Sequence, residues 1–160
     1  MFDYSQNFSK LDFKRNPELY RVGIGEQGVL LVEPYKSELL PLWRFKTPAV
    51  ARESSEAILK KFTEYLHESD FAGMDMARKY LQMGYTRSRR YANHRSGKKY
   101  SGPVPTDKRG QSGSHGRSTL PLDGDPRKAK SAEIFYRAWK KIEGNARYRS
   151  FRSEWKIWYG

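Results

Sequence analysis

The stretch "DFAGMDMARKYLQMGYTRSRRYANH", residues 70–94, decides the fold because it predicts one long helix at the centre of the protein. Asp70 is a suitable N-cap, since its side chain can accept a hydrogen bond from a free N–H of the first turn. The apolar residues fall on two faces: Phe71, Met74, Ala77 and Leu81 on one, and Met76, Tyr80 and Met83 on the other. A helix that is apolar on two sides packs inside a core.

Two further helices are expected beside it. Residues 47–68 form the first, with Thr47 as N-cap and Pro48 in the first turn, and its short connection to residue 70 predicts an antiparallel helical hairpin. The second begins at Asp125 and Pro126 and ends at Gly144. Small residues would let the neighbouring helices approach the central one closely: Ala72, Gly73, Ala77 and Gly84.

The closing segment, residues 145–160, carries aromatic residues at helical spacing: Tyr148, Phe151, Trp155 and Trp158. Aromatic residues in this pattern are more often core than stacking platforms for a ligand. We therefore expect most of them to pack inside, with the arginines between them exposed.

The segment "NPELYRVGIGEQGVLLVEPY", residues 16–35, predicts a β-hairpin, because β-branched and aromatic residues flank a glycine-rich turn. Its glycines match G-x-G-x-x-G, but that motif needs a helix after the last glycine and a strand is expected here. We interpret them as a hairpin turn. The predicted fold is α+β and mainly helical: a small N-terminal β-hairpin packed on an antiparallel helical hairpin, with C-terminal helices.

The organisation is one domain with an internal loop. Residues 1–95 form the core, residues 96–125 a flexible basic loop rich in Gly, Ser and Pro, and residues 126–160 the C-terminal helices that pack on the core. The loop should be the most mobile part of the free protein. Whether it becomes ordered on binding a partner is left open by the sequence.

Composition points to a cytoplasmic protein. Among the 160 residues there is no cysteine, which excludes disulfides, thiolate metal sites and a cysteine nucleophile. No apolar run approaches the ~20 residues of a membrane span, and no secretory signal is visible at the amino terminus. We expect a soluble protein with no membrane partner.

The positive charge is confined to one half of the chain. Residues 1–86 carry twelve basic and twelve acidic side chains, whereas residues 87–160 carry nineteen basic and six acidic ones, which is the whole net charge of +13. Arginine outnumbers lysine in the second half by eleven to eight. Because arginine suits bidentate phosphate contact and stacking on bases, the asymmetry predicts an anionic partner, most commonly nucleic acid.

The densest basic stretch is "YTRSRRYANHRSGKKY", residues 85–100, with six cations, three tyrosines and no acid. A few cations at a helix end would be explained by the helix dipole alone. The continuation beyond the helix favours a surface on which arginines hold phosphates and aromatic rings stack on bases. The predicted nucleic-acid-binding residues are Arg87, Arg89, Arg90, Tyr91, His94, Arg95, Lys98, Lys99 and Tyr100.

Two other function classes stay open. The same basic surface could meet an acidic protein, as in a phage or bacterial assembly factor. Glu33 and Lys36 faintly resemble the acid and lysine of a phosphodiester-directed enzyme such as a nuclease, but two residues separate them and one is Pro34. We assign no catalytic residue, no metal ligand and no cofactor from the sequence.

Three segments resemble a family of small bacterial and tailed-phage proteins defined as a domain of unknown function: "VEPYKSELLPLWRFKTP", "GMDMARKYLQMGYTRSRRYANHRSGKKY" and "FYRAWKKIEGNARYRSFRSEW". The resemblance covers most of the chain. It implies a bacterial or phage-infected cytoplasm as the setting and brings no activity, cofactor or site residue with it.

Overall fold

The computed structural model describes residues 1–160, and its regular structure is helical. The α-helices are α1 (Tyr35–Leu39), α2 (Pro48–His67), α3 (Phe71–Asn93), α4 (Pro126–Glu143) and α5 (Ala146–Tyr159). Short 3-10 helices lie at Phe8–Lys10, Pro17–Leu19, Leu40–Leu42 and Thr106–Lys108. None of the helices is both long enough and apolar enough to cross a membrane.

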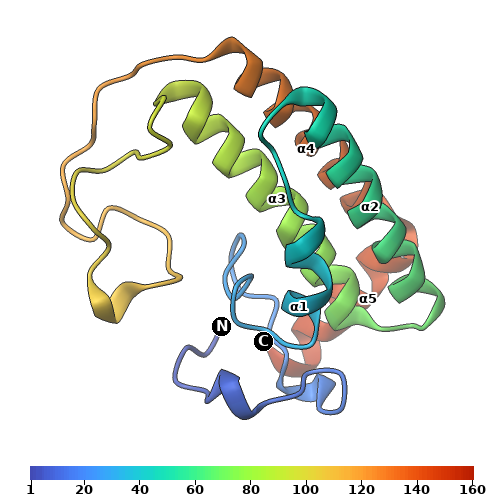
Figure 1. The fold of residues 1–160 in the computed structure, drawn as a ribbon. Helices are drawn as coiled ribbons and strands as arrows, with labels where there is room; N and C mark the ends of the chain where they lie inside the picture. The colour runs from blue at the N-terminus through green and yellow to red at the C-terminus, as the bar shows by residue number, and fades with distance from the viewer.

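α3 is the central helix, as the two-sided apolar pattern predicts. Every residue from Phe71 to Leu81 is buried, and α2 and α4 pack along it (Figure 1). Glycines allow the close approach: a Cβ at Gly73 would lie 2.5 Å from the Tyr65 ring of α2, and one at Gly84 would lie 2.4 Å from the Phe135 ring of α4. The predicted role of the small residues in helix packing is confirmed at these two positions.

The helix starts follow local capping chemistry. Thr47, Asp70 and Asp125 accept a hydrogen bond from a first-turn N–H of α2, α3 and α4 at 3.2, 3.1 and 3.0 Å. Each cap satisfies a backbone donor that the helix itself leaves free. The three predicted N-caps are confirmed.

The predicted N-terminal β-hairpin is wrong, and the chain has no sheet. Residues 16–35 instead form a 3-10 helix and successive tight turns, in which the N–H groups of Leu31 and Val32 both bond to the carbonyl of Gly28. Positive φ angles at Gly23, Gly25 and Gly28 produce the turns. Val22, Val29 and Val32 are buried in the core while Ile24 is exposed, so the three valines pack against the rest of the fold and form no strand.

α5 places its aromatic face against α3, as expected for core residues. Tyr148 is buried, and Phe151 and Trp155 stack on Phe71 with ring centroids 6.3 and 5.0 Å away. Only Trp158 points outward, with 62% of its surface exposed. The tail therefore contributes its rings mainly to the fold.

Residues 96–125, here called the arch, leave the end of α3, extend away from the helices and return to the start of α4 (Figure 1). Isolated β-bridges join its two arms, Tyr100 to Thr119, and its end to α3, His94 to Asp123. Backbone bonds from Ser101 to Ser118 and from Leu120 to Lys99, at 2.8 and 2.7 Å, close its base. Its mobility relative to the helices stays a prediction.

Candidate functional site

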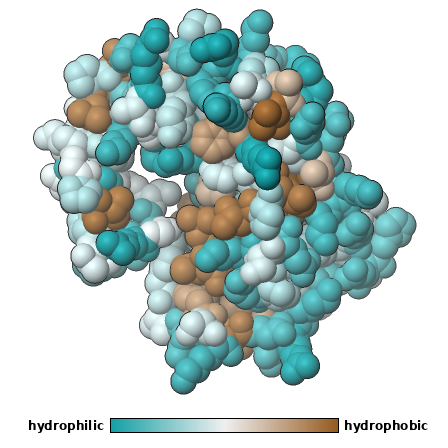
Figure 2. Space-filling view, in the orientation of Figure 1, coloured by the Kyte–Doolittle hydropathy of each residue, from teal (hydrophilic) through white to brown (hydrophobic).

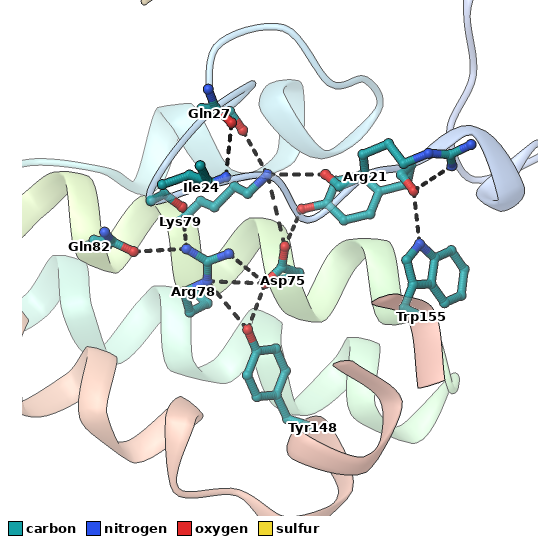
Figure 3. Close-up of polar contacts among 11 residues, drawn as sticks. Arg21, Ile24, Gln27, Asp75, Arg78, Lys79, Gln82, Tyr148 and Trp155 are labelled. Atoms are coloured by element: carbon teal, nitrogen blue, oxygen red, sulfur yellow. Dashed lines mark hydrogen bonds and ion pairs between the residues drawn. The ribbon is translucent and has the colours of Figure 1, made fainter. Parts of the chain in front are cut away.

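Charged side chains form two assemblies along α3, and the first is fully buried. Asp75 lies at the centre, and its Oδ1 accepts hydrogen bonds from Arg78 Nη2 at 2.8 Å and from Tyr148 Oη of α5 at 2.6 Å (Figure 3). The hydroxyl of Tyr20 donates to the other carboxylate oxygen. Asp75, Arg78, Lys79, Tyr20 and Tyr148 are here called the buried charge network.

Lys79 completes this network from the next position of the helix. Its side chain is fully buried, and Nζ donates to the carbonyl oxygen of Gln27 at 2.7 Å and lies 3.9 Å from Asp75 Oδ2. The rings of Phe2 and Tyr20 flank the ammonium group at 5.2 and 4.9 Å. Through its contacts with Gln27, Phe2 and Tyr20, Lys79 holds the N-terminal segment on α3.

Burial disfavours the charged form of each ionisable group in the network. It lowers the pKa of Lys79 to about 7, although the Asp75 carboxylate acts in the opposite direction. Burial would raise the pKa of Asp75, but the charges of Arg78 and Lys79 outweigh it and keep that pKa below its ordinary value. The pKa of Arg78, which burial alone would lower, is raised mainly by Asp75.

The glycine-rich segment, residues 23–28, presents carbonyl oxygens to these cations. Arg78 donates to the carbonyl of Gly25 and Lys79 to that of Gln27, while the N–H of Ile24 bonds to the Gln27 side chain (Figure 3). A phosphate-binding loop requires the opposite arrangement, with free N–H groups directed at the ligand. The segment serves to anchor the N-terminal region.

Sequence reasoning missed the buried charge network. A signal was present: Asp75, Arg78 and Lys79 stand at i, i+3 and i+4 in the most apolar part of the predicted helix. Charges at that spacing share one face, and a charged face on a helix that is buried all round must be paired inside the protein.

The second assembly lies on the last three turns of α3, where Arg87, Arg89 and Arg90 are half-buried. Partial burial and the positive charge of Arg87 hold the pKa of Arg90 below its ordinary value, and Arg117 of the arch lowers it further. Arg87, Arg90 and Arg117, here called the arginine cluster, form no ion pair with any carboxylate. The structure thus places three guanidinium groups from two parts of the chain near one another without an ion-pair partner.

Tyr91 packs within the fold instead of standing free. Its ring contacts Phe45 at 5.6 Å between centroids, and a Cβ on Gly97 would lie only 2.2 Å from it. Lys128 Nζ lies 5.5 Å and the Arg87 guanidinium 5.9 Å from the ring centre. With these neighbours, the ring serves to fold the chain back onto α3 at Gly97.

His94 and Arg95 fasten the arch to α3. His94 is buried, and its Nδ1 lies 2.8 Å from the carbonyl oxygen of Pro121. Arg95 Nε donates to Asp123 Oδ1 at 3.0 Å in an exposed ion pair. Both predicted binding residues have protein partners.

The remaining predicted residues separate into three positions. Arg89 donates to Asn93 at 3.4 Å on the α4 side of the helix, and Lys98 is exposed at the start of the arch. Lys99 and Arg117 lie over the ring of Tyr100, at 5.5 and 5.1 Å from its centre. The structure therefore brings together Arg87, Arg90, Lys99 and Tyr100, and adds Arg117, which the sequence reasoning did not select.

One carboxyl group lies close to the arginine cluster. Burial raises the pKa of Glu26, although a hydrogen bond from Thr86 and the charges of Arg90, Arg78 and Arg87 act against it. Its Oε2 atom is buried and has no hydrogen-bond partner. The group is therefore an incomplete counter-charge for the cluster.

Glu33, one of the two residues that suggested a nuclease, forms hydrogen bonds within the fold. Glu33 accepts hydrogen bonds from Ser37 N at 2.7 Å and Ser37 Oγ at 2.8 Å, which supports the first turn of α1. No group of three or more His, Cys, Asp or Glu side chains is placed to hold a metal ion. Glu33 is thus hydrogen-bonded within the fold, and the nuclease alternative stays a hypothesis.

Comparisons with known proteins agree with the sequence resemblance. No curated protein and no solved structure matches the chain. The model of a family described as "Domain of unknown function (DUF4385)" matches residues 3–157. Because this match spans nearly the whole sequence, the chain belongs to the DUF4385 family.

Proposed function

We propose that the protein binds nucleic acid through phosphate contacts made by the arginine cluster. The observation that carries the proposal is the gathering of Arg87, Arg90 and Arg117 without an ion-pair partner. Like charges held together are unfavourable unless an anion offsets their repulsion. Guanidinium groups bind phosphate oxygens with two parallel hydrogen bonds, which makes a phosphate backbone the best-matched anion.

The position of the cluster supports the same proposal. It lies in the half of the chain that carries the entire net charge of +13, and Lys98, Lys99, Lys108 and Arg109 extend the positive surface along the arch. A field of this kind attracts a long polyanion more strongly than a single anion. We place this activity in a bacterial or phage-infected cytoplasm, on the resemblance described above.

Salt dependence of binding tests the proposal. Fluorescence anisotropy with a labelled oligonucleotide should give a slope of log affinity against log salt of about −3 to −5, for four to six phosphate contacts. Replacing Arg87 and Arg90 together by Ala should make the slope shallower by about one to two units. The control is the Arg149→Ala/Arg152→Ala double variant, which removes the same charge from α5.

The result distinguishes a localised binding site at the arginine cluster from diffuse attraction to the whole basic surface. A larger loss for the α3 double variant than for the α5 control supports the cluster as the binding site. Equal losses would mean diffuse attraction to the whole surface. If the wild type binds no single-stranded DNA, duplex DNA or RNA at low salt, the proposal fails, and an acidic protein becomes the better-supported partner.

A further inference from the structure

α5 has one face that no other part of the chain covers. Its aromatic face packs on α3, and the residues on the opposite face are all exposed: Ala146, Arg149, Ser150, Ser153, Glu154 and Ile157. Alternating steps of three and one residues place them in one continuous stripe along the helix. These six residues are here called the outer face of α5.

The outer face combines a shallow groove with one exposed apolar side chain. The groove has a volume of about 500 Å³, and the residues that line it all belong to α5: Ala146, Arg149, Ser150, Ser153 and Glu154. Ile157 lies one turn beyond Ser153, with 80% of its surface exposed. Most of the outer face is hydrophilic, like the helical side of the molecule at the right of Figure 2. A partner would therefore be recognised by charge and shape.

The two charged residues of the outer face have no partner within the chain. Neither Arg149 nor Glu154 forms an ion pair. A charge on a helix meets the side chains three and four residues away. Those around Arg149 include no acid, and those around Glu154 include no base. Their own helix therefore cannot pair them, whereas a second helix can.

The spacing of the outer face matches the heptad repeat of a parallel two-stranded coiled coil. The a and d positions, which face the other helix, fall on its small and apolar residues: Ala146, Ser150, Ser153 and Ile157. Arg149 then takes a g position, and Glu154 takes the following e position, five residues later. In a parallel pair, the g residue of one helix lies beside the following e residue of the other. Arg149 of each copy would thus meet Glu154 of the other copy.

An antiparallel pair fits the same charges less well. Antiparallel helices face each other g to g and e to e, which would bring Arg149 toward Lys156 of the second copy, and like charges at an interface repel. Glu154 would face Arg147, which already donates to the carbonyl oxygen of Leu66 at 2.9 Å and to the Ser69 hydroxyl. Only the parallel pair makes both charges complementary.

We propose that two copies of this chain associate through the outer face of α5, with the two helices parallel and in register about a two-fold axis. The contact is the same on both copies, as such symmetry requires. The small side chains in the middle allow the two helices to approach closely, and Ile157 of each copy meets Ile157 of the other. This association does not depend on the proposed nucleic-acid binding. Two helical turns on each side of Arg149 and Glu154 make a small interface, so the dimer should dissociate at about 0.1 mM.

Charge reversal tests the pairing in solution. Sedimentation equilibrium of the full chain across that concentration should show a monomer–dimer equilibrium. Arg149→Glu and Glu154→Arg should each weaken it about tenfold or more, because each turns two attractive contacts into two repulsive ones. The double exchange Arg149→Glu/Glu154→Arg keeps the net charge of the chain and should restore the dimer. Arg152→Glu, the same charge change at a half-buried position off the outer face, is the control and should leave the dimer unchanged.

A single cysteine reports the orientation, because the chain has none of its own. In the parallel pair, residue 157 lies beside its own copy, so Ile157→Cys should form an intermolecular disulfide when oxidised glutathione is added. An antiparallel pair would place residue 157 opposite Ala146, about 16 Å along the helix from its own copy, which is too far for a disulfide. Trp158→Cys, also exposed but off the outer face, is the control and should cross-link more slowly.

Several results would overturn the inference: a monomer at every concentration, a dimer that Arg149→Glu leaves unchanged, a double exchange that fails to restore it, or equal cross-linking of the two cysteine variants. The nucleic-acid comparison that uses Arg149→Ala/Arg152→Ala is made at protein concentrations well below those of dimer formation. Both proteins are then monomers, so failure of the dimer and failure of the proposed function are separate results.

Discussion

The two ends of α3 use the same residue types in opposite ways. In the first half, Arg78 and Lys79 are buried and are bound by Asp75 and by carbonyl groups of the glycine-rich segment. In the second half, Arg87 and Arg90 are half-buried and have no ion-pair partner. One continuous helix thus carries cations that hold the fold and cations that have no ion-pair partner.

The difference shows that the surroundings of a cation, and not its residue type, indicate its role. Removal of the partner of a buried cation leaves an uncompensated charge in a medium where water cannot stabilise it. Removal of a half-exposed arginine leaves a site that water can fill. Mutations in the first half of α3 should therefore change stability, and mutations in the second half should change binding.

The largest expected effect is that of Asp75→Ala. The change leaves Arg78 and Lys79 without their carboxylate and Tyr20 and Tyr148 without their acceptor, so the free energy of unfolding should fall by about 3–5 kcal/mol. Denaturant titration followed by circular dichroism measures the loss. The matched control is Asp123→Ala, which removes an exposed Asp–Arg pair and should cost less than about 1 kcal/mol.

If the Asp75 and Asp123 variants lose the same free energy of unfolding, the buried ion pair stabilises the protein no more than the exposed one does. Asp75→Asn refines it, because the amide keeps an acceptor for the tyrosines but not the charge. If Asp75→Asn is nearly as damaging as Asp75→Ala, the charge carries most of the effect.

The parts of the fold that could be predicted were those determined by local chemistry. Thr47, Asp70 and Asp125 cap helices because a side-chain oxygen near a helix start needs nothing beyond the first turn. The segment around Val29–Val32 could not be predicted in the same way. Its turns depend on Lys79, Arg78 and Trp155, which bond to backbone carbonyls from positions about 50 to 135 residues distant.

For the candidate site, the sequence shows where positive charge accumulates but not which side chains lie together. Charge counts alone place it in the second half of the chain, because an excess of arginine needs no structural context to be seen. Tyr91 and His94 were assigned to a ligand; in the structure Gly97 packs on the Tyr91 ring and His94 contacts the Pro121 carbonyl oxygen, and a ligand role for either residue stays a prediction. Arg117 was not selected because its approach to Arg90 depends on the path of the arch.

A smaller effect is expected when Lys79 titrates. Its pKa is about 7 in the folded protein and 10.5 in its ordinary state. Between these values the unfolded chain binds a proton that the folded chain has released, so the free energy of unfolding rises with pH. Relative to Lys79→Met, the wild type should gain about 1–2 kcal/mol between about pH 7 and pH 9.

The pH profile is read from denaturant titrations of both proteins at several pH values. The slope, and not the absolute stability, is the measured quantity, because methionine also loses the bonds to Gln27 and Arg21. Parallel profiles for the two proteins would show that Lys79 keeps an ordinary pKa in the folded state.

The smallest expected effect concerns Glu26, which lies where the two regions of α3 meet. Its carboxyl group is close to Arg87 and Arg90, and burial raises its pKa. When ionised, it offsets part of the positive charge that the proposed phosphates would meet; when protonated, it leaves that charge uncompensated. Nucleic-acid affinity should therefore rise as the pH falls through the raised pKa of Glu26.

Glu26→Gln should bind at all pH values as the protonated wild type does. The difference between the two proteins should be about two- to threefold where Glu26 is ionised, because a partly exposed charge acts through screened solvent, and it should shrink as the pH falls through the raised pKa of Glu26. A constant ratio of affinities across this range would mean that Glu26 does not exchange its proton on binding, and that the buried and the open half of α3 act independently.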